Sequence, residues 1–275
     1  MKTRIYTADT DQFRDAETYS RIYEALPESR KSKISRFRRE EDRLRSLAAG
    51  ALLLRLARDE GLPGDLADLT ENAYGKPFFS GHPDVQFSLS HSGTKVLLAA
   101  SDRPVGCDVE EIRTDWNYMS IVKRYFAPEE YARLTEETDP EARALLFYRL
   151  WTLKESFLKE TGRGLYLPLE NFRIIFEKET DGALRIRVTF PETHDPAVSG
   201  DVFFLSDAPG DGCAYAFCIA GDGAEFSGKT FQKLLVPYFT DLEYDNDTRL
   251  WSSRIGKAEF RSRARKLTRP VIRSS

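Results

Sequence analysis

The spacing of apolar residues changes along the chain and divides it into helices and strands. Apolar positions three and four apart predict helices over residues 11–26, 30–59, 117–135 and 141–160. In the last of these segments Leu150, Leu153 and Phe157 share one face, and Pro140 stands directly before the segment as a start signal. The chain therefore has a large helical component.

Short apolar and β-branched runs elsewhere predict strands. They cover residues 2–7, 85–90, 94–101, 105–110, 172–176, 184–190, 202–205 and 214–220. The second and third of these runs flank His91-Ser-Gly93, which predicts a β-hairpin with His91 at its tip. Because helices and strands are grouped rather than strictly alternating, we expect the α+β fold class. The two halves of the chain share this order loosely, which fits either chance or an internal duplication.

Length and C-terminal composition bear on the domain organisation. A chain of 275 residues is long for one simple core, so two lobes are expected, although one elongated domain also fits. The character changes after Gly221: residues 226–240 are amphipathic, residues 241–247 are acidic, and residues 252–275 hold eight basic residues and one acid. We treat residues 222–275 as an appended segment of unassigned role.

Charge and cysteine content exclude several classes of protein. The 41 basic and 44 acidic residues leave a net charge of −3, so the chain as a whole has no strong attraction to nucleic acid or to an anionic membrane. Its three cysteines form neither a disulfide framework nor a zinc-ligand pattern, which favours a reducing compartment. The sequence shows no signal peptide and no stretch of ~18 apolar residues. We expect a cytoplasmic protein with no membrane or nucleic-acid partner.

Two carboxylates on one predicted strand are the first candidates for chemistry. In Gly106-Cys-Asp-Val-Glu110 the residues Asp108 and Glu110 are two apart, so strand alternation points both to the same side. Such a pair suits magnesium, which takes one or two protein carboxylates together with phosphate oxygens and water. Gly106 allows a backbone or a ligand to approach closely. A solvated strand end is the alternative interpretation.

Three further segments carry charged or polar side chains whose roles the residues alone leave open. Glu155 and Lys159 lie four residues apart on a predicted helix, which fits either a site or a surface salt bridge. Ser90 and His91 at the hairpin can hold a phosphate or remain solvated. Residues 30–45 contain eight basic residues and three acids, an excess that suits phosphates, an acidic protein surface or nucleic acid.

Taken together, these segments resemble the phosphopantetheinyl transferases of the surfactin-synthetase type. The resemblance is carried by Tyr74-Gly-Lys-Pro77, Phe87-Ser-Leu-Ser-His-Ser-Gly93, Pro104-Val-Gly-Cys-Asp-Val-Glu110, Trp151-Thr-Leu-Lys-Glu-Ser-Phe-Leu-Lys159 and Gly162-Arg-Gly-Leu165, whose order and spacing agree over residues 1–221. In that family two similar α+β lobes are related by a pseudo-twofold axis. The resemblance therefore implies an N-terminal lobe at 1–105 and a C-terminal lobe at 106–221, with no counterpart for residues 222–275.

The resemblance also implies a binding site for coenzyme A between the lobes. The residues that would bind Mg²⁺, with the coenzyme A pyrophosphate completing the shell, are Asp108, Glu110 and Glu155. The residues that would face this pyrophosphate are Lys154 and Lys159. The residues that would hold the 3′-phosphate are Arg30, Lys33, Lys76, Ser90 and His91. Arg30 departs from the family pattern, in which lysine is commoner, and this change keeps the charge but alters the geometry.

The activity implied by the resemblance is transfer of the 4′-phosphopantetheine arm of coenzyme A to a serine hydroxyl of an apo acyl or peptidyl carrier protein. Glu130 would act as the base, alongside Glu155 and Lys159 as catalytic groups; a metal-bound water or the neighbouring Glu129 are alternatives for the base. The reaction would require Mg²⁺ and release adenosine 3′,5′-bisphosphate, and the protein would act as a monomer. A non-catalytic coenzyme A or carrier-protein binding module is the alternative function, and a nucleic-acid module is a second. The carrier can belong to fatty acid, polyketide or nonribosomal peptide synthesis.

Overall fold

The structure is a computed structural model that describes residues 3–178, 184–190 and 198–223, together with three further strands. These strands are β11 (Leu235–Pro237), β12 (Leu242–Asp245) and β13 (Leu250–Ser253). Contacts between residues group the chain into two units, Met1–Val236 and Pro237–Ser275. In the second unit β12 and β13 pair antiparallel. Most of the predicted appended segment, including most of the amphipathic stretch 226–240, lies outside the described residues.

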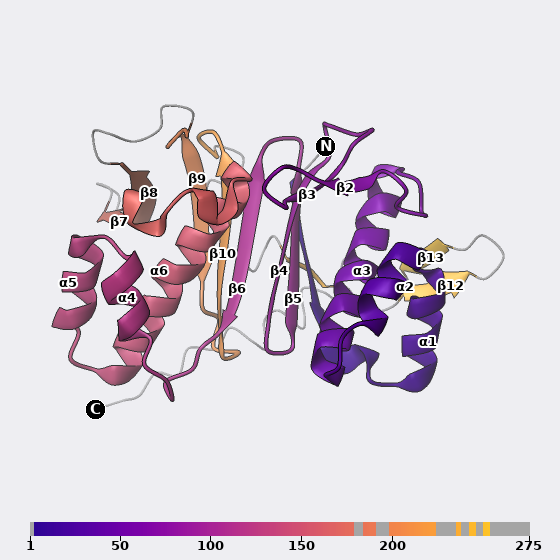
Figure 1. Ribbon diagram of the computed structural model, residues 1–275, viewed down its shortest axis with the longest axis horizontal. Helices are drawn as coiled ribbons and strands as arrows, with labels where there is room; N and C mark the ends of the chain where they lie inside the picture. The colour runs from indigo at the N-terminus through magenta and orange to yellow at the C-terminus, as the bar shows by residue number, and fades with distance from the viewer. Residues whose placement is uncertain are drawn as a thin grey trace. The chain divides into compact units, whose positions relative to one another are not determined.

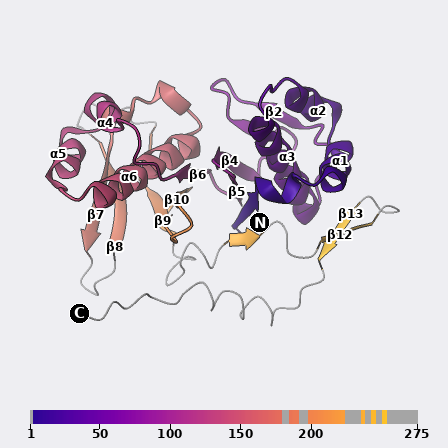
Figure 2. The same ribbon diagram turned by 90° about the horizontal axis from the view of Figure 1, so that it is seen from below.

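The first sheet comes mostly from the apolar runs of the N-terminal half. Its order is β11, β1 (Arg4–Asp9), β5 (Lys95–Ser101) and β4 (Gln86–Ser92), and β5 pairs antiparallel with both β1 and β4. Strand β5 is buried from Val96 onward, as expected for a strand between two others. The 3-10 helix η1 (Thr10–Phe13) and the helices α1 (Ala16–Ala25), α2 (Glu28–Ser35) and α3 (Glu40–Glu60) form one group (Figure 2), in which α3 packs on β1 and β5.

The second sheet supports the long helix of the C-terminal half. Its antiparallel order is β6 (Val105–Glu111), β10 (Cys213–Ala220) and β9 (Val202–Asp207). Helix α6 (Pro140–Thr161) packs on β6 and β10 through Leu150, Leu153 and Phe157, which are all buried. The remaining elements are α4 (Met119–Tyr125), α5 (Pro128–Glu136), η2 (Gly164–Tyr166), η3 (Leu169–Asn171) and the hairpin of β7 (Arg173–Lys178) and β8 (Leu184–Thr189).

The two sheets meet where β4 and β5 contact β6, in the centre of Figure 1. Their facing side chains form one apolar cluster that includes Leu97 from β5 and Val109 from β6. On the other side of β6, helix α6 comes unusually close, because a Cβ atom at Gly106 would lie 1.8 Å from the backbone oxygen of Ser156. The predicted close approach at Gly106 is therefore made by the helix backbone. It places α6 directly beside the strand that carries Asp108.

A small hairpin of the N-terminal half reaches the end of α6. Strands β2 (Leu69–Glu71) and β3 (Pro77–Phe79) pair antiparallel, and the turn between them approaches the residues that follow the helix. The amide of Asn72 donates to the backbone oxygen of Gly162 at 2.9 Å. The rings of Tyr74 and Tyr166 meet edge to face, with centroids 5.0 Å apart. The hairpin therefore connects the first half of the molecule to the C-terminal end of α6.

The predicted α+β class is confirmed, but two of the predicted helices are each split. The helix expected over 30–59 ends at Ser35 and starts again at Glu40, where three acidic residues in the first turn favour a helix N-terminus. The helix expected over 117–135 breaks before Pro128, because a residue that precedes proline is pushed out of the helical conformation, and Ala127 is extended. None of the described helices is long and apolar enough to cross a lipid bilayer.

The hairpin of β4 and β5 differs from the prediction in one detail that matters for the site. His91 pairs with Val96 inside the ladder, so only Gly93 and Thr94 make the turn. Gly93 has a φ of 53°, which glycine adopts readily. His91 therefore lies on a strand rather than in the turn, and its side chain remains exposed.

Candidate functional site

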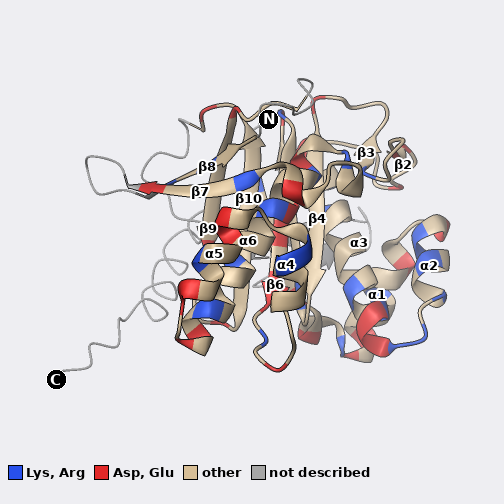
Figure 3. Ribbon diagram, turned by 60° about the vertical axis from the view of Figure 1, so that its left-hand side comes forward, with Lys and Arg blue, Asp and Glu red and all other residues tan. Residues whose placement is uncertain are grey.

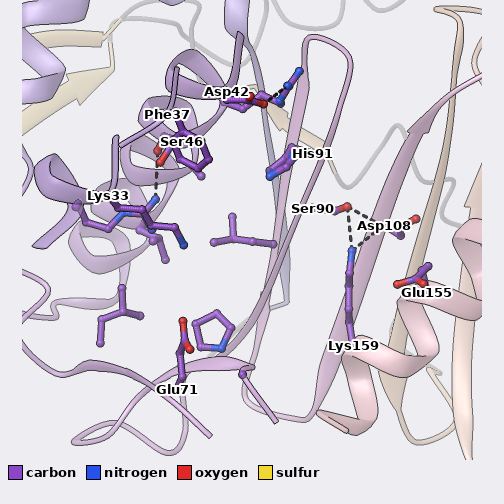
Figure 4. Close-up of a pocket in the computed structure, with 18 of the residues that line it drawn as sticks. Lys33, Phe37, Asp42, Ser46, Glu71, Ser90, His91, Asp108, Glu155 and Lys159 are labelled. Carbon is purple, nitrogen blue, oxygen red and sulfur yellow. Dashed lines mark hydrogen bonds and ion pairs between the residues drawn. The ribbon is translucent and has the colours of Figure 1, made fainter. Parts of the chain in front are cut away.

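A cavity of about 750 Å³ opens between the helices beside the first sheet and the edge formed by β4, β6 and α6. Figure 4 shows Lys33, Phe37 and Ser46 on one wall, and Ser90, Asp108, Glu155 and Lys159 on the opposite wall. Residues of the β2–β3 hairpin, among them Glu71, complete the lining. The cavity thus has a largely basic and apolar wall facing a wall that carries three carboxylates.

Asp108 is the most buried carboxylate of the acidic wall, with 2% of its surface exposed. Its Oδ1 accepts hydrogen bonds from Ser90 Oγ at 2.6 Å and from Lys159 Nζ at 2.6 Å. Lys159 Nζ also donates to Ser90 Oγ at 3.0 Å. Asp108 Oδ2 is buried and has no hydrogen-bond partner. An ionised oxygen in that position is an unsatisfied acceptor, which a cation would stabilise.

Glu110 and Glu155 add two further carboxylates to this wall. Burial, and then repulsion from Asp108, raise the pKa of Glu110 to about 7, although Ser92 donates a hydrogen bond to it at 2.8 Å. The same two causes raise the pKa of Glu155. Burial lowers the pKa of Lys159, but attraction to Asp108 and the other nearby groups outweighs it, so the net shift is upward. The wall therefore concentrates negative charge around one ammonium group.

Helical spacing explains how α6 supplies this wall. Trp151, Glu155 and Lys159 follow one another at intervals of four residues, and all three line the cavity. The apolar face of α6 is turned away into the core. The two functional side chains are thus on one stripe of a helix whose opposite stripe is fixed by packing.

The carboxylates of the acidic wall are suitable ligands for a divalent cation. The candidate donors are hard carboxylate oxygens, and Asp108 Oδ2 is free of other partners. No preformed group of three or more His, Cys, Asp or Glu side chains close enough to hold a metal occurs in the part of the chain that the structure describes. Magnesium does not need one, because it retains waters and takes phosphate oxygens as ligands. The carboxylates therefore suit a magnesium ion that binds together with a phosphorylated ligand.

The opposite wall has the chemistry of a phosphate site with an apolar neighbourhood. Arg30 donates to the backbone oxygen of Ser46 at 3.2 Å, while its Nε is buried without a hydrogen-bond partner. Lys33 is exposed at the cavity, and Phe37 lies beside it. Burial, and then repulsion from Arg45, lower the pKa of His91, which favours the neutral imidazole. Basic positions are visible on α2 in Figure 3.

Two family models match consecutive parts of the chain. Residues 14–103 match the 4′-phosphopantetheinyl transferase N-terminal family, and residues 104–217 match the 4′-phosphopantetheinyl transferase superfamily. A 4′-phosphopantetheinyl transferase of Bacillus subtilis is 32% identical over 238 residues, which is 84% of this chain and the full length of that protein. The chain belongs to the 4′-phosphopantetheinyl transferase family. The 4′-phosphopantetheinyl transferase Sfp of Bacillus subtilis (strain 168) is 33% identical over 195 residues, or 70% of this chain and 84% of that protein. The resemblance stated from the motifs is confirmed.

In this phosphopantetheinyl transferase the structure brings together most of the predicted site residues. Those that line the one cavity are Arg30, Lys33, Ser90, His91, Asp108, Glu110, Glu155 and Lys159. Three predicted residues are elsewhere, namely Lys76, Glu130 and Lys154.

Lys76, predicted to hold the 3′-phosphate, is not among the residues that line the cavity. Lys76 Nζ donates to the backbone oxygens of Val105 at 3.0 Å and Glu160 at 3.3 Å. The neighbouring Gly75 and Pro77 do line the cavity. Burial lowers the pKa of Lys76. Its cation therefore stabilises a carbonyl at the C-terminal end of α6, where the helix dipole is negative.

Glu130 and Lys154 lie apart from the cavity residues and form a buried ion pair with each other. Lys154 Nζ lies 2.9 Å from Glu130 Oε2, and their side chains are 0% and 4% exposed. Burial lowers the pKa of Lys154. A base must reach the proton that it removes, and a phosphate ligand must reach the phosphate. Neither side chain lines the cavity, so the structure does not bring these two residues together with the other predicted site residues.

Ser88, Ser90 and Ser92 lie in a row along β4, and the sequence analysis assigned a role only to Ser90. The hydroxyls of Ser88 and Ser92 accept hydrogen bonds from backbone N–H groups of β6, at Cys107 and Glu111. Ser90 Oγ accepts from the N–H of Val109 at 3.4 Å. The available signal was the alternation of serine with other residues in Phe87–Gly93. These serines join β4 to β6 and hold the two carboxylates of that strand.

Arg45 is a second residue that the prediction did not assign. It lines the cavity from α3, where it contacts Asp42 Oδ1 at 2.5 Å and the backbone oxygen of Gly93 at 2.9 Å. Its only sequence signal was its position within the basic stretch 30–45. Because it lies beside His91, it adds positive charge to the phosphate side of the cavity.

Proposed function

We propose that this chain transfers the 4′-phosphopantetheine arm of coenzyme A to a serine hydroxyl of an apo acyl or peptidyl carrier protein, depends on Mg²⁺, and releases adenosine 3′,5′-bisphosphate. The proposal rests on the surroundings of Asp108. Its Oδ2 is buried without a hydrogen-bond partner, and the same cavity contains two more carboxylates and a basic opposite wall. Coenzyme A is a large anion with phosphates at two positions, which suits a cavity of two differently charged walls.

The residues divide into two groups in this proposal. Arg30 and Lys33 hold the 3′-phosphate of coenzyme A by charge, and His91 adds a hydrogen bond. Asp108, Glu110 and Glu155 would hold the magnesium ion, which when bound neutralises the charge of the pyrophosphate. Two walls that each bind one phosphorylated end fix the position of the reacting phosphorus.

The transfer step needs stabilisation of negative charge. The serine oxygen attacks the β-phosphorus, the bond from that phosphorus to the bridging oxygen breaks, and adenosine 3′,5′-bisphosphate leaves with this oxygen while the hydroxyl proton is released. Charge grows on the phosphoryl oxygens and on the leaving oxygen. The ammonium group of Lys159, held by Asp108 and Ser90, is positioned to stabilise that charge.

Intact mass spectrometry of an apo carrier protein tests the proposal. After incubation with the chain, coenzyme A and Mg²⁺, the carrier should gain the mass of one phosphopantetheine group, and chromatography should detect adenosine 3′,5′-bisphosphate. Excess chelator should stop both changes. Absence of the mass gain on a panel of acyl and peptidyl carriers would instead favour a non-catalytic binding module. The same panel shows which kind of carrier the chain prefers.

A further inference from the structure

The buried ion pair between Glu130 and Lys154 lies within the second half of the molecule, beside the helix that lines the cavity. Lys154 belongs to α6 and Glu130 to α5. Lys154 Nζ also donates to the backbone oxygens of Leu169 at 2.9 Å and Phe172 at 2.6 Å. It lies 4.4 Å from the centroid of the Phe172 ring. One ammonium group thus connects α6 to α5 and to the segment that leads into β7.

Both carboxylate oxygens of Glu130 also have partners within the fold. Its Oε2 accepts from the backbone N–H of Ala127 at 3.0 Å in addition to Lys154, and its Oε1 accepts from the N–H of Ile174 at 2.7 Å. Both carboxylate oxygens therefore have partners inside the fold, and the residue is 4% exposed. Because the carboxylate is buried and both of its oxygens are engaged, it does not present an exposed oxygen to an acceptor serine.

The position of Lys154 on α6 determines what the pair can do. Successive residues of an α-helix point about 100° apart, so anchoring Lys154 fixes the direction of its neighbour Glu155. Lys154 stands four residues after Leu150 and three before Phe157, on the buried face. Lys159 shares the cavity stripe with Glu155. A rotation of α6 about its axis would move both cavity residues at once.

We propose that the Glu130–Lys154 pair is an internal anchor that sets the rotation of α6, aims Glu155 and Lys159 at the cavity, and takes no part in removing the serine proton. Glu130 and Lys154 are positioning residues in this account. The inference deepens the proposed function and rests on it, because Glu155 and Lys159 matter only if the cavity performs the transfer. A buried ion pair is suited to this role, since it demands one geometry.

The test compares a broken pair with a neutral pair in the full chain. Glu130→Gln leaves the Lys154 charge without its partner, so we expect a lower melting temperature and a kcat reduced about 10- to 100-fold per folded molecule well below that temperature. KM for coenzyme A should rise by a smaller factor than kcat falls, because the residues assigned to the 3′-phosphate are on other elements. The double variant Glu130→Gln with Lys154→Met should recover both stability and kcat. Glu136→Gln, at an exposed position of the same helix α5, is the matched control and should behave as wild type.

Three outcomes would overturn the proposal. Recovery of the melting temperature in the double variant without recovery of kcat would identify Glu130 as a base, whose loss costs about 100- to 10,000-fold. A destabilised single variant with full kcat would show that the pair only stabilises the fold. An acidic limb of the pH–rate profile that is lost in Glu130→Gln would also assign proton transfer to Glu130.

Two controls separate failure of the anchor from other failures. Because methionine cannot donate to the carbonyl oxygens of Leu169 and Phe172, Glu130→Gln with Lys154→Gln is made in parallel. If neither double variant folds, the pH–rate profile of Glu130→Gln still decides, since an unchanged profile shape supports the anchor. Transfer by the wild-type chain in the same assay tests the proposed function independently of the pair.

Discussion

At the scale of single residues, the two oxygens of Asp108 have unequal surroundings. Oδ1 is held by Ser90 and Lys159, whereas Oδ2 is buried without a partner. Asp108→Asn keeps the shape and removes the charge, so we expect holo-carrier formation to fall by about 100-fold or more while the chain stays folded. Initial rates at saturating Mg²⁺ measure this. The exposed Glu111 at the end of the same strand provides the control, since Glu111→Gln should retain the wild-type rate. Equal losses of rate in both variants would contradict the proposed role of Asp108.

Glu110 gives the site a dependence on pH. Its pKa is raised to about 7, so it binds a proton as pH falls through that value. The folded protein then holds more protons than the unfolded chain between the ordinary glutamate pKa and about 7, which means that this group costs stability as pH rises through that interval. A divalent cation bound beside Glu110 offsets this loss of stability, and it does so only when Glu110 is ionised. We therefore expect Mg²⁺ with coenzyme A to raise the melting temperature more at pH 8 than at pH 6.

Glu110→Gln is the variant that checks the origin of this pH dependence. It removes the titrating group, so the increment in melting temperature caused by Mg²⁺ should be smaller and should no longer differ between the two pH values. A wild-type increment that is equal at both values, or a difference that persists in Glu110→Gln, would assign the pH dependence to another group.

At the scale of the elements, the contact of α6 with β6 fixes the acidic wall. Gly106→Ala would place a Cβ atom 1.8 Å from the backbone oxygen of Ser156, and neither backbone can move without displacing its element. We expect a loss of about 1–3 kcal/mol or more in the free energy of unfolding, measured by denaturant titration. Gly64→Ala is the control, since nothing lies within 4 Å of a Cβ there, and its effect should stay within about 0.5 kcal/mol. Equal stability of the two variants would contradict the close approach.

Much of this element structure could be predicted from the sequence. The strand alternation of Asp108 and Glu110 put both carboxylates on one side of β6, and Gly106 indicated a close approach. The helical spacing could also have predicted that Lys154 is buried, because it lies on the same apolar face of α6 as Leu150 and Phe157. Its partner Glu130 could not be found in this way, since the pair depends on how α5 packs on α6, which no local period encodes. The same limit applies to Lys76, whose acceptors at Val105 and Glu160 are distant in the sequence.

At the scale of the whole molecule, every described cavity residue precedes residue 160, and the relative from Bacillus subtilis spans only 84% of this chain although its full length is matched. A chain that ends at Pro237 keeps β11 and the complete cavity. We expect it to transfer phosphopantetheine at the rate of the full chain, measured by holo-carrier formation with saturating coenzyme A. A large loss of rate, with the melting temperature preserved, would assign residues 238–275 a part in the reaction.

The proposed site holds one divalent cation between three carboxylates of β6 and α6 and the pyrophosphate of coenzyme A. A crystal grown with coenzyme A and Mn²⁺ tests this directly through the anomalous signal of manganese. We expect one peak about 2.0–2.2 Å from Asp108 Oδ2, with oxygens of Glu110, Glu155 and the pyrophosphate as its other neighbours. A peak away from these residues, or a pyrophosphate bound on the opposite wall, would contradict it.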